Sequence, residues 1–170
     1  MPYRLDVTQG DWPAAELGKG VEGILAESTV LTLATAGHEL GPNANLAFFA
    51  YDDDLVLYFV SERATRHSLH LTEDARAAAT VFLPPPAFGE HLRGVQLAGS
   101  AGEAWGRQAE AAFAAYRARF PSFGQDPEVR DRLLAGRGAA ALYRFQVDEL
   151  TAVDEPQFGR RNYLRAKVVR

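Results

Sequence analysis

The chain has 170 residues, of which 47% are hydrophobic and 24% are charged, and it contains no cysteine. This length allows one domain with a substantial core, and the lack of cysteine excludes disulfides, thiolate metal ligands and cysteine nucleophiles. The formal net charge of -4 gives no broad basic field, so we expect no nucleic-acid or membrane partner and only local anion binding. Neither a signal-peptide core nor an apolar run near the ~20 residues of a membrane helix is found, so a cytoplasmic location is expected.

The first part of the chain predicts a helix followed by a β-meander. Apolar residues recur at helical spacing in the N-terminal segment, 1–28, which is expected to be helical. Three β-rich runs follow, over 29–36, 43–51 and 55–61, and the turn-forming links between them predict two hairpins. A single short helix is then expected over 64–71.

The second part adds strands, a helical insertion and a basic tail. Strands are expected over 77–84 and 93–105, the latter with glycines at bends or bulges. A helical insertion is expected over 106–138, a final strand over 140–154, and a basic tail over 156–170. About six strands in short meander steps, with the helices set apart, predict one mainly β (α+β) domain: an antiparallel barrel with peripheral helices.

The segment YFVSERATRHSLHL passes from a strand end into a helix start and is rich in groups that hold anions. Such a junction offers unpaired backbone N–H groups, hydroxyl donors and a guanidinium that can grip a phosphate with two hydrogen bonds. Arg63 and Arg66 need not point the same way, and Arg66 is the expected ligand. The alternative is a solvated helix in which Arg66 pairs with a nearby acid and His67 and His70 lie at the surface.

Other chemistries have little support in the sequence. His38 and Glu39 resemble an acid/base pair, but adjacent residues usually diverge and nothing else is arranged around them. No HExxH or His-x-His pattern indicates a metal site, and no GxSxG pattern indicates a hydrolase nucleophile.

Three segments in order carry a family resemblance: VLTLATAGHELGPNANLAFF, LVLYFVSERATRHSLHL and RGVQLAGSAGEAW. Together with the later RFP and FGRR, this series resembles the pyridoxamine 5'-phosphate oxidase-like FMN-binding split barrels. The resemblance is strongest from Thr29 to Trp105. It implies a homodimer of split β-barrels, with FMN in a groove at the dimer interface that both subunits contact.

The resemblance assigns the opening cluster to the flavin phosphate. Ser61, Thr65 and Arg66 match the family's hydroxyl and arginine positions, and His67 stands where a lysine is frequent. Gln96 matches a strand glutamine that reaches the flavin in relatives, its alternative being an outward-facing strand position.

Further contacts to the flavin ring are implied on the first hairpin. The resemblance places Thr32, Thr35, Asn43 and Asn45 near the isoalloxazine ring, whose carbonyl and N–H groups need neutral partners such as amides. Asn43 and Asn45 share a strand face because side chains alternate, although Asn43 also suits a turn.

The partner subunit is expected to complete the site. Trp105 and Arg160 are expected to close the pocket from that subunit, although a basic C-terminal tail is more often solvated.

The expected function is flavin-dependent electron transfer on a small organic substrate, with FMN as cofactor and no catalytic side chain assigned. Three alternatives remain: a flavin-binding storage or sensing module without turnover, a deazaflavin- or heme-binding relative, and a cofactor-free dimeric scaffold. Pyridoxamine 5'-phosphate oxidase activity itself is not expected, because the chain is short and lacks a convincing basic set for a second phosphate.

Overall fold

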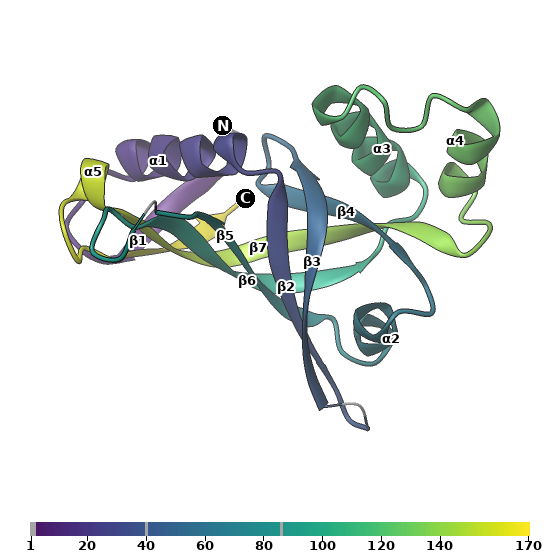
Figure 1. The fold of residues 1–170 in the computed structure, drawn as a ribbon, viewed down its shortest axis with the longest axis horizontal. Coiled ribbons are helices and arrows are strands. Elements are labelled where there is room, and N and C mark those ends of the chain that lie inside the picture. Colours follow the sequence, from purple (N-terminus) through teal and green to yellow (C-terminus); the bar gives the residue numbers. More distant parts are fainter. Residues whose placement is uncertain (1–2, 40, 86) are drawn as a thin grey trace.

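A β-barrel with helices outside it is formed by residues 3–39, 41–85 and 87–170, the part of the chain that the computed structural model describes (Figure 1). The described residues form eight strands: β1 (Arg4–Gln9), β2 (Val30–Gly37), β3 (Gly41–Tyr51), β4 (Val56–Glu62), β5 (Arg76–Leu83), β6 (Arg93–Glu103), β7 (Ala140–Asp154) and β8 (Leu164–Val169). They also form five helices: α1 (Ala14–Glu27), α2 (Arg66–Glu73), α3 (Arg107–Arg119), α4 (Pro127–Leu134) and α5 (Glu155–Phe158).

The long strand β7 closes the sheet into a barrel. The strands follow the order β1-β8-β7-β4-β3-β2-β5-β6, and β6 pairs again with β7, so that the strands from β7 round to β6 form a closed antiparallel ring. With 15 residues, β7 can pair with β4 along its first half and with β8 along its second half, while its other edge pairs with β6. The predicted antiparallel barrel with peripheral helices is therefore confirmed.

Apolar side chains fill the barrel and a second layer outside it. Leu33, Phe59 and Phe145 are fully buried in the interior cluster. Outside β3, β4 and β7, the helices α3 and α4 cover another apolar cluster that includes Tyr58 and Tyr116. Because both faces of β4 are covered, its sequence is a continuous apolar run without polar alternation. The predicted helical insertion is thus a layer packed on the barrel wall (Figure 1).

Two strands at the chain ends and the short α5 were not predicted. β1 pairs with β8, and β8 pairs with β7, so both ends of the chain extend the sheet beyond the ring. Leu164 and Ala166 of β8 are fully buried, whereas Arg165 and Lys167 between them are exposed. The segment expected as a basic tail therefore contains a strand with one buried face, and the N-terminal helical segment contains β1 as well as α1.

A β-bulge interrupts the pairing of β6 with β7. Ala98 pairs with Glu149 but the next residue, Gly99, pairs with Val147, which leaves one extra residue, Asp148, on β7. A Cβ atom at Gly99 would lie 1.9 Å from the Gln146 carbonyl oxygen. The predicted glycine at a bulge is confirmed here, because the partner backbone approaches too closely for a side chain.

The short helix α2 packs against β2, and Figure 1 shows it beside the extended β2–β3 hairpin, with α3 and α4 on another side of the barrel. None of the described helices has both the length and the hydropathy needed to cross a membrane. The β4–α2 junction is therefore at one end of the barrel, where a polar cluster lies.

Candidate functional site

A network of hydroxyl and imidazole groups lies at the junction of β4 and α2. The Ser61 Oγ atom lies 2.6 Å from His67 Nε2 and 3.2 Å from Thr65 Oγ1. Thr65 Oγ1 also lies 3.2 Å from His67 Nε2 and 2.9 Å from Ser68 Oγ, and it donates to the Glu62 carbonyl at 2.8 Å. The structure thus brings Ser61, Thr65 and His67 together, as predicted from the sequence.

The N-terminus of α2 keeps its backbone donors uncapped. Thr65 occupies the N-cap position, but its side chain accepts no hydrogen bond from the first turn of the helix. Arg66, the first helical residue, is exposed, and its side chain makes no hydrogen bond or ion pair with any other residue in the described ranges. Free N–H groups, the positive end of the helix dipole and an uncommitted guanidinium together favour an anion at this position.

The guanidinium of the other arginine in this segment, Arg63, is hydrogen-bonded within the protein. Its Nε atom donates to both carboxylate oxygens of Glu103, and Nη2 donates to the Gly136 carbonyl at 3.0 Å. Its guanidinium also lies 5.8 Å from the centre of the Trp105 ring. Arg66, the predicted phosphate ligand, therefore differs from Arg63, because its side chain has no such contacts among the described residues.

Thr35, Asn43 and Asn45 lie on the inner face of the β2–β3 hairpin. Thr35 pairs with Asn43, and Asn45 pairs with the buried Leu33, so these side chains share one face. Thr35 Oγ1 lies 3.0 Å from Nδ1 of the fully buried His70. The Oδ1 atom of Asn45 is buried and has no hydrogen-bond partner among the described residues. This face therefore holds a polar acceptor that is free to bind a donor.

Thr32 and Gln96 lie on the opposite, outer face of the barrel. Thr32 pairs with Thr80, which pairs with Gln96, and Gln96 pairs with Thr151, so the four form one polar row across four strands. Shallow cavities of about 230 and 260 Å³ both include Thr80 and Gln96. The predicted ring contacts are therefore divided between two faces of the sheet.

Large apolar side chains lie near this row, among them Leu46, Phe48 and Phe82, which are 74%, 62% and 53% exposed. Leu46 is the direct cross-strand partner of Thr32.

Trp105 and Arg160 lie near opposite ends of β6. Trp105 lies two residues after the end of β6 and packs against Gly136, whereas Arg160 donates to the Gly89 carbonyl at 3.0 Å, before the strand begins. A strand of 11 residues is roughly 35 Å long. One chain therefore does not bring Arg160 to the same place as Trp105 and the β4–α2 junction.

Sequence reasoning missed the buried part of this network. His70 and Ser68 are buried, and Tyr143 packs its ring against Phe59 with centroids 5.0 Å apart. Burial raises the pKa of Tyr143, while a hydrogen bond with Ser68 and the nearby Arg63 oppose this shift and Glu103 adds to it. The alternative in which the two histidines of α2 lie at the surface is wrong. Their spacing of three residues was the available signal, because it places both on one helix face.

Protonation of His67 is expected to weaken the fold. Burial, and next the neighbouring His70, lower the pKa of His67. The unfolded chain therefore takes up a proton before the folded chain does, so the free energy of unfolding falls as the pH drops below about 6.5. Urea denaturation at several pH values between about 7.5 and 5 measures this slope. His67→Gln is expected to flatten it, while His38→Gln, at an exposed position, is expected to leave it unchanged; equal effects would contradict the assignment.

Comparison with known proteins gives matches in sequence and in fold. Residues 17–153 match the family described as pyridoxamine 5'-phosphate oxidase. Over 103 residues the chain is 30% identical to a UPF0306 protein of Pasteurella multocida (strain Pm70), covering 60% of this chain and 68% of that protein.

Two solved structures share the fold. A heme-binding protein from Mycobacterium smegmatis has a TM-score of 0.71 at 20% identity; the match covers 93% of this chain, which spans 60% of the length of that protein. HutZ, the heme storage protein from Vibrio cholerae, has a TM-score of 0.62 at 17% identity, with 81% of this chain and 94% of that chain covered. These likenesses show the split-barrel fold. Since the family match covers most of the sequence, the chain belongs to the pyridoxamine 5'-phosphate oxidase family.

Proposed function

We propose that the protein binds FMN and places its phosphate at the N-terminus of α2. The observation that carries this proposal is the contrast between Arg63, whose guanidinium is fully used by Glu103 and carbonyl groups, and Arg66, which is exposed without a partner among the described residues. Beside Arg66 are the uncapped N–H groups of the helix, whereas the hydroxyl of Thr65 donates to the Glu62 carbonyl. A phosphate fits this donor set, since it accepts from backbone N–H groups and from a guanidinium together.

The isoalloxazine ring would then lie along the β2–β3 hairpin. Asn45 offers a buried acceptor that lacks a donor, and the flavin ring carries an N–H group that can supply one. Thr35 is already bonded to His70, so its part would be to hold α2 against the hairpin.

A second copy of the chain would cover the outer face and complete the groove. Leu46 and Phe48 are both exposed beside the row that contains Thr32 and Gln96, and contiguous exposed apolar side chains mark interaction surfaces. Arg160 is too far along β6 to join Arg66 within one chain. A homodimer would let Arg160 of one protomer approach the proposed phosphate site of its partner.

The proposed activity is flavin-dependent oxidoreduction of a small organic molecule. A bound flavin supplies the redox chemistry by accepting a hydride at its N5 atom, and the protein supplies binding, orientation and shielding from water. No side chain is required as a nucleophile. A protein that binds flavin without turnover would use the same residues.

A heme-binding function is the second candidate, because two of the similar structures are heme proteins by name. The histidines of α2 are poor axial ligands, since His67 Nε2 bonds to Ser61 and His70 is fully buried. His38 and His91 are exposed, so they are the histidines accessible to the iron.

The colour and bound ligand of the purified protein separate these functions. We expect the absorption bands of oxidised flavin, and a released molecule with the mass of FMN. A Soret band would favour heme, and a colourless protein that takes up neither added FMN nor hemin would exclude both. For a flavin-loaded protein, anaerobic reduction by NADH or NADPH followed by reoxidation distinguishes an enzyme from a carrier.

A further inference from the structure

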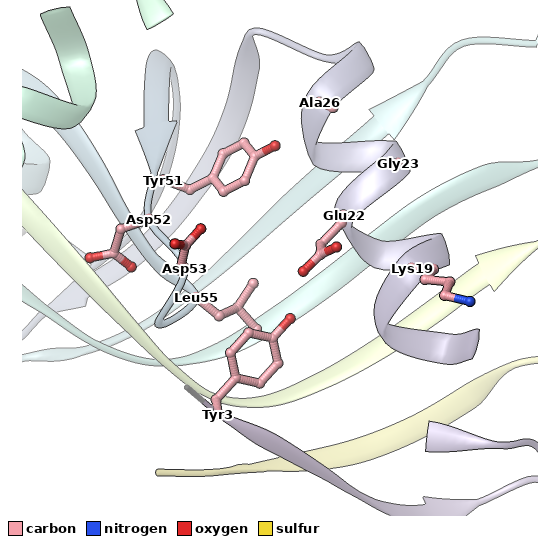
Figure 2. A pocket seen from close by; sticks show the side chains of 9 residues that line it. All are labelled: Tyr3, Lys19, Glu22, Gly23, Ala26, Tyr51, Asp52, Asp53 and Leu55. Carbon is pink, nitrogen blue, oxygen red and sulfur yellow. The ribbon is translucent and has the colours of Figure 1, made fainter. Parts of the chain in front are cut away.

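A separate cavity, of about 500 Å³, lies between α1, the start of the chain and the turn that joins β3 to β4 (Figure 2). Its lining includes Tyr3, Glu22 of α1, and Tyr51, Asp53 and Leu55 from the β3–β4 region. None of the predicted flavin-site residues contributes to this lining. The cavity is therefore separate from the site proposed for FMN.

The carboxylates that line the cavity differ in the hydrogen bonds that they make. Asp52 holds the turn, since its oxygens accept from the Asp54 and Val56 N–H groups at 3.0 Å and from the Tyr58 hydroxyl at 2.6 Å. The side chains of Glu22 and Asp53 make no hydrogen bond or ion pair with any other residue of the described part, and Figure 2 shows both carboxylates directed into the cavity. Two negative charges therefore face the same space without compensation.

The cationic side chains near the cavity, Lys19 and Arg119, make their contacts with other groups. Lys19 lies at the edge of the cavity, but its Nζ atom is 2.9 Å from Glu16, and Figure 2 shows it turned away from Glu22 and Asp53. Arg119 lies 5.1 Å from the Tyr51 ring centre, and its guanidinium donates to the Leu25 carbonyl at 2.7 Å. The cavity consequently keeps a local negative potential.

An unsatisfied hydroxyl inside the cavity independently indicates a ligand. Tyr3 is 6% exposed, and its hydroxyl oxygen is buried without a hydrogen-bond partner in the described residues. Figure 2 shows this hydroxyl directed toward Glu22. Burial, followed by the nearby Glu22 and Tyr51, raises the pKa of Tyr3 to about 12, so the group stays a neutral phenol. A buried polar group without a partner destabilises the fold, and a bound donor would remove that cost.

We propose that this cavity binds the ammonium group of a small organic cation, with Glu22 and Asp53 as counter-ions and the Tyr3 hydroxyl oxygen as a further acceptor. The rings of Tyr3 and Tyr51, with Leu55, contact the apolar part of the ligand. A bare metal ion fits less well, because the described residues contain no group of three or more His, Cys, Asp or Glu placed to hold one. The volume also suits a molecule of several carbon atoms rather than a single ion.

Calorimetric titration of the purified chain with 1,4-diaminobutane tests this proposal. We expect saturable binding of the diamine and none of 1,4-butanediol, which has the same carbon chain without charge. Glu22→Gln and Asp53→Asn are each expected to weaken binding about three- to tenfold, because each removes one partly exposed counter-ion. Tyr3→Phe, which removes only the unsatisfied oxygen, is expected to weaken it about two- to tenfold.

Asp54→Asn is the matched control, because it makes the same charge change in the same turn but lies outside the lining. Its affinity is expected to stay within about twofold of the original, since exposed charges contribute little at this distance. The proposal is overturned if the original protein does not bind the diamine, if Asp54→Asn weakens binding as much as Asp53→Asn, or if Mg²⁺ displaces the diamine at equal concentration. None of these readouts depends on flavin.

Discussion

Replacing Arg66 by alanine is expected to weaken FMN binding by about tenfold to more than a hundredfold. A hydrogen bond between a guanidinium and a phosphate contributes about 1.5–3 kcal/mol, and each 1.4 kcal/mol corresponds to about a tenfold change in Kd. The fold itself should be unaffected, because Arg66 is exposed and no contact with another described residue depends on it. Fluorescence titration of the apoprotein with FMN measures the loss directly.

Arg107→Ala provides the matched control for this experiment. Arg107 is also exposed and is also the first residue of a helix, α3, whose N-cap position likewise lacks a side-chain hydrogen bond. Both substitutions remove one positive charge from a helix N-terminus, so a general charge effect would act on both alike. An unchanged affinity in Arg66→Ala, or equal losses in the two variants, would remove the phosphate from α2. Titration with riboflavin adds a second control, because without a phosphate its affinity should not respond to Arg66.

The elements that depend on local sequence could be predicted, because their signals lie within a few residues. The final strand predicted over 140–154 has the same ends as β7, and α3 begins one residue after the predicted start of the helical insertion at 106. β1 and β8 could not be found in this way. Each has six residues, each exposes charged side chains, and they pair across about 160 positions of the chain, as Leu5 does with Val168. Their stability comes from that distant pairing rather than from local propensity.

The same difference between local and distant contacts explains which parts of the two sites could be predicted from the sequence. Thr65, Arg66 and His67 are neighbours in sequence, so their meeting at the start of α2 follows from one strand–helix junction. The hydrogen-bonded ion pair of Arg63 with Glu103 joins residues 40 positions apart, so it could not be inferred from local sequence. The 500 Å³ cavity could not be predicted from local sequence either, because its lining comes from the start of the chain, α1 and the β3–β4 turn.

The β-bulge between β6 and β7 changes the register of the two strands just after Gln96 and the outer polar row. Before the bulge, Gln96 pairs with Thr151. After it, Ser100 pairs with Gln146, so the register of β7 against β6 has shifted by one residue. Without the bulge, every residue beyond it would point to the opposite face of the sheet. Gly99 makes the bulge possible, because the Gln146 carbonyl occupies the space of a side chain.

Gly99→Ala is therefore expected to lower the free energy of unfolding by about 3 kcal/mol or more, or to prevent folding. The added Cβ atom would meet backbone atoms on β7, the Gln146 oxygen at 1.9 Å and the Asp148 nitrogen at 3.1 Å, which cannot rotate away as a side chain can. Gly102→Ala on the same strand is the control, since its Cβ atom would meet nothing within 4 Å, and its stability should change by less than about 1 kcal/mol. Urea denaturation of both variants measures the difference. Equal stabilities would mean that β7 can move away from Gly99 at little cost.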